Sequence, residues 1–197
     1  INNKIYDGSS TSELIPTYVS ARYYDWVETA SFDASSTIQI TVPDLRVYIV
    51  GSNDDKPEYY HIQTAIDEAD EGETIRAWNG TYLENIEIDE ELTIIGNGTS
   101  TIINGGNDTA IDVTEDSVTI KNLMIIYSEK GIYVNSTEDT VVTSVKFVTS
   151  EYAVYSEDSQ NLIVNNSIFD VDDYGIYLDE SSDVSVMDNE FRNGTQT

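Results

Sequence analysis

Three consecutive stretches of the chain share one pattern: GIYVNSTEDTVVTSVKFVTSEY at 131–152, AVYSEDSQNLIVNNSIFDVDDY at 153–174 and GIYLDESSDVSVMDNEFRNGT at 175–195. A repeat of 22 residues lies in the range typical of solenoids, in which each unit buries its apolar face against its neighbours. Within each repeat, three short segments alternate apolar with polar residues, as β-strands do, and turns rich in Asn, Ser, Asp and Gly separate them. The repeat therefore predicts one coil of an all-β parallel β-helix.

The aligned repeats place residues of one kind in columns. The inward columns expected are Val118, Thr140, Leu162 and Val184; Ile120, Val142, Val164 and Val186; Ile125, Phe147, Phe169 and Phe191; and Ile111, Ile132, Val154 and Ile176, each of the last four preceded by Ala or Gly. A polar column of Asn122, Ser144, Asn166 and Asp188 is also expected to point inward, at a bend where its side chains bond backbone groups of adjacent coils.

A different pattern precedes the repeats. Ile62, Ala65, Ile66 and Ala69 follow i, i+3, i+4, i+7 spacing, which predicts a short helix near 62–70 that Gly72 can end. Short strands are expected around 74–77, 86–88, 92–95 and 101–103. The first coil of a solenoid needs a cap over its apolar core and unpaired backbone, and the helix can provide one.

The stretch IQTAIDEADEGETIRAWNGTYLENIEI at 62–88, followed by LTIIGNGTSTIING, resembles the opening of right-handed parallel β-helix proteins of the pectate-lyase-like superfamily, in its carbohydrate-binding and sugar-hydrolase group. The resemblance covers about residues 47–197 and implies a single-stranded right-handed β-helix with coils of about 22 residues. It does not imply one function, because the superfamily includes lyases, hydrolases, epimerases, adhesins and inert stalks. Residues 1–46 do not match and are expected to form a β segment, packed on the solenoid or part of an assembly contact.

The composition is strongly acidic. Asp and Glu number 37 against 9 Lys and Arg, for a net charge of −28, which excludes nucleic acid and anionic lipid as partners. No apolar run is long enough to insert in a membrane. The opening without Met suggests a processed or trimmed product. Sequons for glycosylation occur at Asn79, Asn97, Asn107, Asn135, Asn165 and Asn193, and the chain has no Cys. The sequons, the acidic composition and the missing Cys together favour an extracellular or cell-surface glycoprotein.

Catalytic motifs of the superfamily are hard to find. Its galacturonan hydrolases combine aspartates with Gly-His-Gly and Arg-x-Lys, whereas His61 is the single His and Arg-x-Lys is missing. The pair Asp172 and Asp173 lacks those companions, and no basic residue stands in a familiar lyase motif. These observations favour a non-catalytic protein over an enzyme.

Two columns are candidate binding sites. Tyr133, Tyr155 and Tyr177 lie between inward residues, so they should point outward as one flat aromatic strip that either binds sugars or simply stabilises neighbouring coils. Glu129, Glu151 and Asp173 should share one turn, where they either bind Ca²⁺ or form a solvated acidic edge.

The sequence thus favours a non-catalytic module of a cell-surface or filament assembly, in contact with copies of itself, other surface proteins or glycans. The alternative is a lyase or glycoside hydrolase acting on acidic polysaccharide. Val184, Val186 and Phe191 belong to core columns, and no capping helix follows them in these 197 residues, so the last coil is expected to expose apolar side chains. Either the native chain continues past Thr197 or another subunit supplies the cap, and docking against a neighbouring subunit is favoured.

Overall fold

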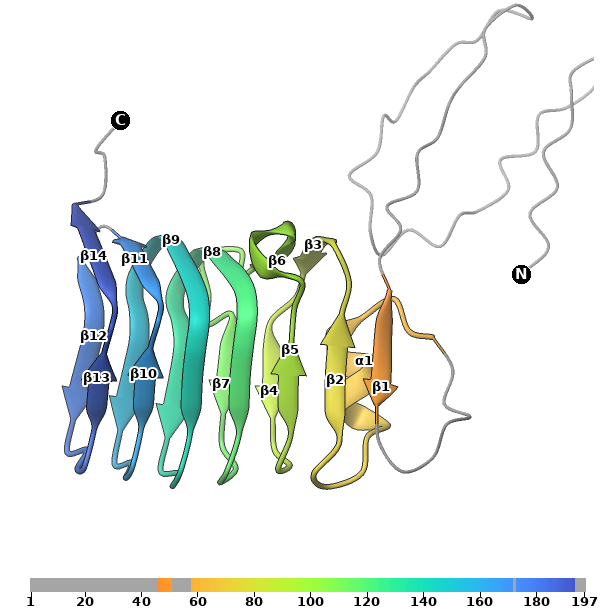
Figure 1. The fold of residues 1–197 in the computed structure, drawn as a ribbon, viewed down its shortest axis with the longest axis horizontal. Helices are drawn as coiled ribbons and strands as arrows, with labels where there is room; N and C mark the ends of the chain where they lie inside the picture. The colour runs from red at the N-terminus through yellow and green to blue at the C-terminus, as the bar shows by residue number, and fades with distance from the viewer. Residues whose placement is uncertain (1–45, 51–57, 172, 194–197) are drawn as a thin grey trace, which may run out of the picture. The chain divides into compact units, whose positions relative to one another are not determined.

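The computed structural model describes residues 46–50, 58–171 and 173–193. These residues form a stack of coils with parallel strands, which confirms the predicted β-helix (Figure 1). The elements are β1 (Val47–Val50), α1 (Ile62–Asp67), β2 (Thr74–Ala77), β3 (Gly80–Leu83), β4 (Ile86–Ile88), β5 (Thr93–Ile95), a 3₁₀ turn (Gly98–Ser100), β6 (Thr101–Asn104), β7 (Ile111–Val113), β8 (Thr119–Asn135), β9 (Val141–Glu157), β10 (Ile163–Asn165), β11 (Ile168–Val171), β12 (Tyr174–Asp179), β13 (Ser185–Met187) and β14 (Glu190–Asn193).

The strands line three faces of the stack. One face runs through β2, β5, the starts of β8 and β9, β10 and β13; the second contains β3, β6, the middles of β8 and β9, β11 and β14; the third contains β4, β7, the ends of β8 and β9, and β12. Strands β8 and β9 each pass over all three faces without interruption. Side chains in the same register position of successive coils therefore lie directly above one another, as the aligned columns require.

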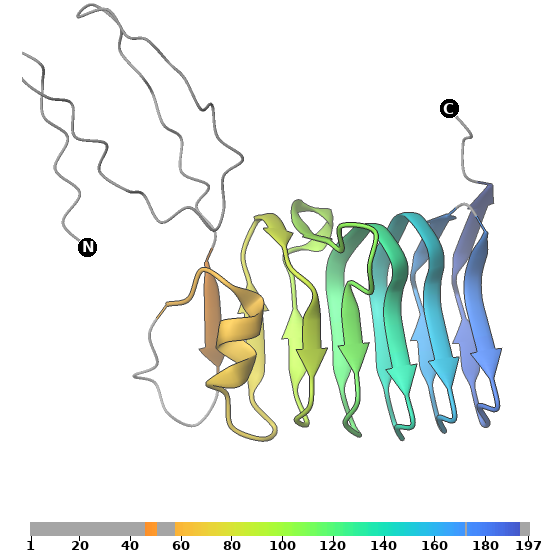
Figure 2. The same ribbon diagram turned by 180° about the vertical axis from the view of Figure 1, so that it is seen from behind.

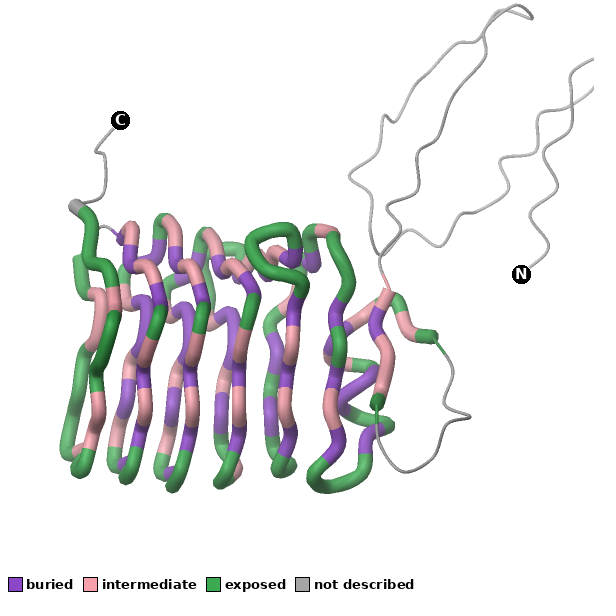
Figure 3. The backbone as a smooth tube through the Cα atoms, viewed as in Figure 1, coloured by how far each residue is buried: buried purple, intermediate pink, exposed green. Residues whose placement is uncertain are grey.

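The expected apolar columns fill the interior. Ile120, Val142 and Val164 are fully buried, as are Ile111, Ile132 and Val154 on another face. In the aromatic column, Phe147 lies 5.2 Å from Phe169, and Phe169 lies 4.7 Å from Phe191, with nearly parallel rings. Burial decreases abruptly at the last coil (Figure 3), where Phe191 is 58% exposed and Val186 is 44% exposed. The exposed apolar coil expected from the sequence is therefore present.

The polar column expected to face inward points outward instead. Asn122, Ser144, Asn166 and Asp188 are exposed, and all four have φ between 50° and 57°, a left-handed conformation that Asn and Asp tolerate better than most residues. The left-handed backbone at these positions bends the chain, and their side chains remain outside the core.

The inward position is one residue later. There the Ser167 hydroxyl accepts a hydrogen bond from the Val145 N–H, and the Asn189 side chain accepts one from the Ser167 N–H. The coil-to-coil polar ladder exists, but the sequence pattern placed it one residue too early.

Both β1 and α1 lie at the N-terminal end of the stack (Figure 2). Strand β1 pairs antiparallel with β2, so it covers the edge of the first coil, a role that the sequence pattern did not reveal. Helix α1 buries Ile62, Ala65 and Ile66 in the common core. It ends at Asp67, earlier than the expected boundary near residue 70. Strand β3 was also not predicted, and apart from Arg46 the β segment expected at 1–46 lies outside the described residues.

Candidate functional site

Six side chains gather at one corner of the stack, on the third, fourth and fifth coils. Two register columns build it, Lys130–Tyr152–Tyr174 and Tyr133–Tyr155–Tyr177, and we call this set the tyrosine corner. The corner arises because two consecutive residues point inward between the columns, such as Gly131 and Ile132, which are both buried. A side chain at Gly131 would place its Cβ 2.5 Å from the Ala153 carbonyl oxygen, so a residue without a side chain is required for this close approach.

The rings of the tyrosine corner pack against each other. Tyr152 stacks on Tyr174 at 5.0 Å with an interplanar angle of 5°, and Tyr155 stacks on Tyr177 at 4.9 Å and 27°. Between the columns, Tyr152 meets Tyr155 edge-on at 5.3 Å. The flat strip expected for Tyr133, Tyr155 and Tyr177 is wrong, because Tyr133 meets Tyr155 edge-on at 5.5 Å and 79°, whereas Tyr177 covers one face of Tyr155. Among the described residues, Tyr174 and Tyr177 each stack on one ring only, and they are the most exposed members of the corner, at 49% and 36%.

Lys130 closes one end of the corner. Its ammonium nitrogen lies 4.3 Å from the ring centroid of Tyr133 and 4.8 Å from that of Tyr155. Those distances are typical of cation–π interaction, in which the negative ring face attracts a positive charge. The tyrosine corner thus already accommodates one cation of the chain itself.

Carboxylates give the tyrosine corner a negatively charged environment. The Tyr133 hydroxyl donates a hydrogen bond to the Glu157 carboxylate at 2.5 Å, and burial together with this bond raises the pKa of Tyr133. Burial and the charge of Glu151 raise the pKa of Tyr152, while burial and the charges of Glu157 and Asp179 raise that of Tyr155. All three phenols therefore remain neutral at physiological pH.

Asp112 precedes Tyr133 in the same register column. Among the described residues, its Oδ1 atom is buried without a hydrogen-bond partner. Burial raises the pKa of Asp112, the neighbouring charge of Glu87 raises it further, and Lys130 partly opposes both effects. The carboxylate is therefore held in an unfavourable environment beside the tyrosine corner.

The carboxylates of Glu129, Glu151 and Asp173 are exposed, as an edge column should be. They border an open depression of about 320 Å³ together with Asn107, Ser128 and Thr149. Below it, the buried hydroxyls of Ser128 and Ser150 are 2.8 Å apart and hydrogen-bonded. Within the part of the chain that the structure describes, no group of three or more His, Asp or Glu side chains is arranged to hold a metal ion. Calcium binding by this column stays a prediction without structural support.

The residues considered for catalysis do not come together. His61 Nδ1 lies 3.2 Å from a carboxylate oxygen of Glu84, and the same carboxylate accepts hydrogen bonds from the N–H groups of Ile62 and Gln63. Glu84 thus caps α1 from a neighbouring element, and His61 belongs to this structural contact. Asp172 lies outside the described residues, and Asp173 belongs to the exposed carboxylate column.

The sequons differ in their surroundings. Asn79, Asn97 and Asn107 are exposed, whereas Asn135 and Asn165 are half-buried. The Asn97 amide donates a hydrogen bond to Asn79 at 2.7 Å. The side chain of Asn193 lies outside the described residues. Glycosylation at these six positions stays a prediction.

The fold and the site define a parallel β-helix protein with an aromatic and acidic surface at one corner. A family model described as periplasmic copper-binding protein (NosD) matches residues 64–197, and the chain belongs to this family. Comparisons with curated proteins and with solved structures gave no match. The family's periplasmic location confirms the expected extracellular or cell-surface localisation. No helix within residues 46–50, 58–171 and 173–193 has the length and apolar character needed to cross a membrane.

Proposed function

We propose that this protein is a non-catalytic extracellular β-helix module of a surface assembly, and that it contacts glycans through the tyrosine corner. The observation that carries the proposal is the convergence of five tyrosines from three coils on one corner of a hydrogen-bonded stack. Strands hold such side chains more precisely than loops do, which favours recognition. Exposed tyrosines present both an apolar ring and a polar tip.

The mode of contact differs from simple stacking of sugars on ring faces. Because Tyr174 covers one face of Tyr152 and Tyr177 covers one face of Tyr155, a glycan would meet ring edges, hydroxyls, the remaining faces of Tyr174 and Tyr177, and the neighbouring carboxylates. Phenol hydroxyls both donate and accept hydrogen bonds, and carboxylates accept them from sugar hydroxyls. The column repeat along the stack presents these groups at regular coil spacing of about 4.8 Å, which suits a chain of repeated sugar units.

The description of the family raises the question of copper. Copper prefers imidazole, thiolate and thioether ligands, but the whole chain has no Cys, one His and two Met. His61 contacts Glu84. Met124 lies on β8, while Met187 shares a register column with Asn165 on a different face of a later coil. These residues do not fit a copper site, and we assign no copper chemistry to the chain.

A lyase or hydrolase of acidic polysaccharide is the other candidate from the sequence. Its substrate would carry uronate carboxylates, which the carboxylates around the tyrosine corner repel. We therefore keep the non-catalytic module as the proposed function. Incubation of the protein with acidic polysaccharides, with and without Ca²⁺, should release no oligosaccharides, and turnover lost on substitution of Glu151 would contradict the proposal.

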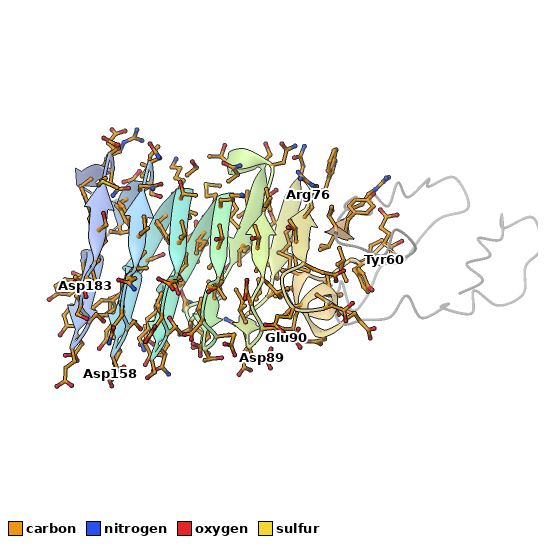
Figure 4. All side chains as sticks on the ribbon, turned by 60° about the horizontal axis from the view of Figure 1, so that its bottom comes forward. Tyr60, Arg76, Asp89, Glu90, Asp158 and Asp183 are labelled. Carbon is orange, nitrogen blue, oxygen red and sulfur yellow. The ribbon has the colours of Figure 1, made fainter. Side chains whose placement is uncertain are left out.

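The binding test uses the full chain and a panel of oligosaccharides of matched length, measured by calorimetry. The double variant Tyr174→Phe, Tyr177→Phe keeps both rings but removes two exposed hydroxyls, and each lost hydrogen bond should weaken binding roughly two- to tenfold. Tyr60→Phe is the matched control, since Tyr60 is 65% exposed and lies at the other end of the stack (Figure 4). Absence of binding to every member of the panel, or equal loss in the control, would refute glycan contact at the tyrosine corner.

A further inference from the structure

Two rows of carboxylates border the tyrosine corner. Glu151 and Asp173 directly precede Tyr152 and Tyr174 in sequence and border the open depression. Glu157 and Asp179 follow Tyr155 and Tyr177 by two residues and are paired in register on β9 and β12. The electrostatic influence of Glu151, Glu157 and Asp179 reaches the phenols themselves. An aromatic surface here is therefore enclosed on both sides by negative charge.

Positive charge does not repeat along this surface. Between residues 129 and 179 the sequence has ten Asp and Glu but two basic residues, Lys130 and Lys146. Lys146 is paired with Met124 and Ile168, on another face of the stack. In the column of Lys130, the next two coils have Tyr152 and Tyr174. The cation at the first position of the column is thus replaced by tyrosines while the bordering carboxylates continue.

Lys130 shows what kind of group this surface accepts. Its ammonium lies over two tyrosine rings within a field made negative by carboxylates. An ammonium has three N–H donors and no acceptor, so it matches surfaces built from carboxylates, phenol oxygens and π-systems. A carboxylate on a ligand would instead meet like charges at short range, which costs free energy.

We propose that the tyrosine corner selects cationic glycans, namely polymers of amino sugars with free amino groups, over neutral and uronate-containing glycans. This inference rests on the proposed function, since it specifies the chemistry of the glycan that the same surface contacts. The amines pair with the two carboxylate rows, and the sugar rings pack against the tyrosine edges. Charge complementarity identifies the occupant, because the surface offers acceptors in excess and a single neighbouring ammonium.

The experiment compares three short oligosaccharides of equal length with the full chain at 0.15 M NaCl: oligomers of glucosamine, of N-acetylglucosamine and of galacturonic acid. Acetylation removes the positive charge but keeps the sugar backbone, so this pair isolates the amine. We expect the glucosamine oligomer to bind at least about tenfold more tightly than its acetylated form, the size of effect expected for several charge-assisted hydrogen bonds, and the galacturonate oligomer not to bind.

A polycation can also bind any acidic protein without specificity, and a matched pair of variants tests this. Glu151→Gln with Asp173→Asn removes two charges that border the tyrosine corner, and Asp89→Asn with Glu90→Gln removes two from the turn between β4 and β5 (Figure 4). That turn is about three coil spacings, or roughly 14 Å, from Tyr152 along the stack, beyond the Debye length of about 8 Å. The first variant should weaken glucosamine binding roughly tenfold, given about threefold per charge, and the second less than twofold.

The outcomes distinguish failure of the charge selectivity, failure of glycan contact and non-specific attraction. Equal binding of acetylated and free oligomers would overturn the charge selectivity while leaving glycan contact intact. Lack of binding to all three would overturn both. Tighter binding of galacturonate would overturn the inference directly, and equal losses in the two charge variants would show non-specific attraction to the acidic surface. Melting temperatures of both variants serve as the folding control, since all four substituted side chains are exposed.

Discussion

At the scale of single residues, Asp112 is the clearest conflict between a side chain and its environment. Its pKa in the folded protein lies above the usual value of 3.8, because burial and the charge of Glu87 disfavour ionisation. A carboxyl with a raised folded-state pKa stabilises the protein fully at pH below its unfolded-state pKa, and this contribution disappears as the pH rises through the folded-state pKa. As the pH rises, the charge on Asp112 therefore increasingly destabilises the fold, and among the described residues its buried Oδ1 atom has no hydrogen-bond partner.

The variant Asp112→Asn removes this charge with little change of shape. We expect its melting temperature to exceed that of the native protein at pH 7, and the difference to shrink as the pH falls through the acid range. Thermal melts from pH 3 to pH 7 provide the measurement. A variant that is less stable at pH 7 would mean that the attraction between Asp112 and Lys130 outweighs the burial of the charge.

The polar column shows what a sequence pattern conceals at this scale. Alternation predicts which side a residue faces only while the strand stays extended. Asn122, Ser144, Asn166 and Asp188 have left-handed backbone conformations, which break the alternation between two strands. The inward role passes to the following residue, as the hydrogen bonds of Ser167 and Asn189 show. Asn and Asp at a repeated position were a signal for the bend, not for an internal ladder.

At the scale of strands, the column of stacked phenylalanines ties β9, β11 and β14 together. Phe169 is 1% exposed and lies between Phe147 and Phe191. Because neighbouring coils are fixed by backbone hydrogen bonds, they cannot close the space left by a smaller side chain. Phe169→Ala should lower the free energy of unfolding by about 3–5 kcal/mol, measured by urea denaturation. Phe191→Ala, at a position 58% exposed, should cost clearly less; equal costs would contradict the inward assignment of Phe169.

Strand periodicity predicted most of the elements because every coil repeats the same alternation of buried apolar and exposed polar residues. It missed β1 and β3, which lie in or beside the first coil, where the repeat is least regular. It also missed Tyr152 and Tyr174, since their column begins with Lys130 and so showed no uniform chemistry. The flat aromatic strip failed for a geometric reason: a coil spacing of about 4.8 Å is too small for tyrosine rings to lie side by side. Comparison of that spacing with the width of a ring would have excluded the flat strip.

At the scale of the whole molecule, the net charge of −28 opposes close approach of two copies, while the last coil favours it. The repulsion acts over about 10 Å at 0.1 M salt but only about 3 Å at 1 M.

The repeat revealed the fold, and composition indicated the location, because both depend on many residues. The site could not be predicted as well, since it depends on how a few rings pack.

Charge repulsion between two copies and attraction between their exposed apolar last coils oppose each other, which leads to a prediction about assembly. Val186, Met187 and Phe191 are 44%, 51% and 58% exposed, although the corresponding residues Val164 and Phe169 of the preceding coil are buried. Among the described residues, β13 pairs with β10 and β14 with β11 only, and apolar side chains beside such an open strand edge form a surface on which another chain can add. We therefore expect the 197-residue chain to associate reversibly at 1 M NaCl and much less at 0.1 M. Analytical ultracentrifugation over a range of concentrations measures this difference.

Replacement of one exposed side chain tests which surface is responsible. Phe191→Asp adds a charge to the apolar patch and should abolish the association at 1 M NaCl, while the earlier coils remain folded because their core does not depend on it. Leu83→Asp is the matched control, since Leu83 is 60% exposed but lies on β3 in the first coil, and it should associate like the native chain. A monomer at all concentrations and both salt conditions would show that the exposed coil needs no partner. Loss of association in the control alone would instead place the contact at the opposite end of the stack.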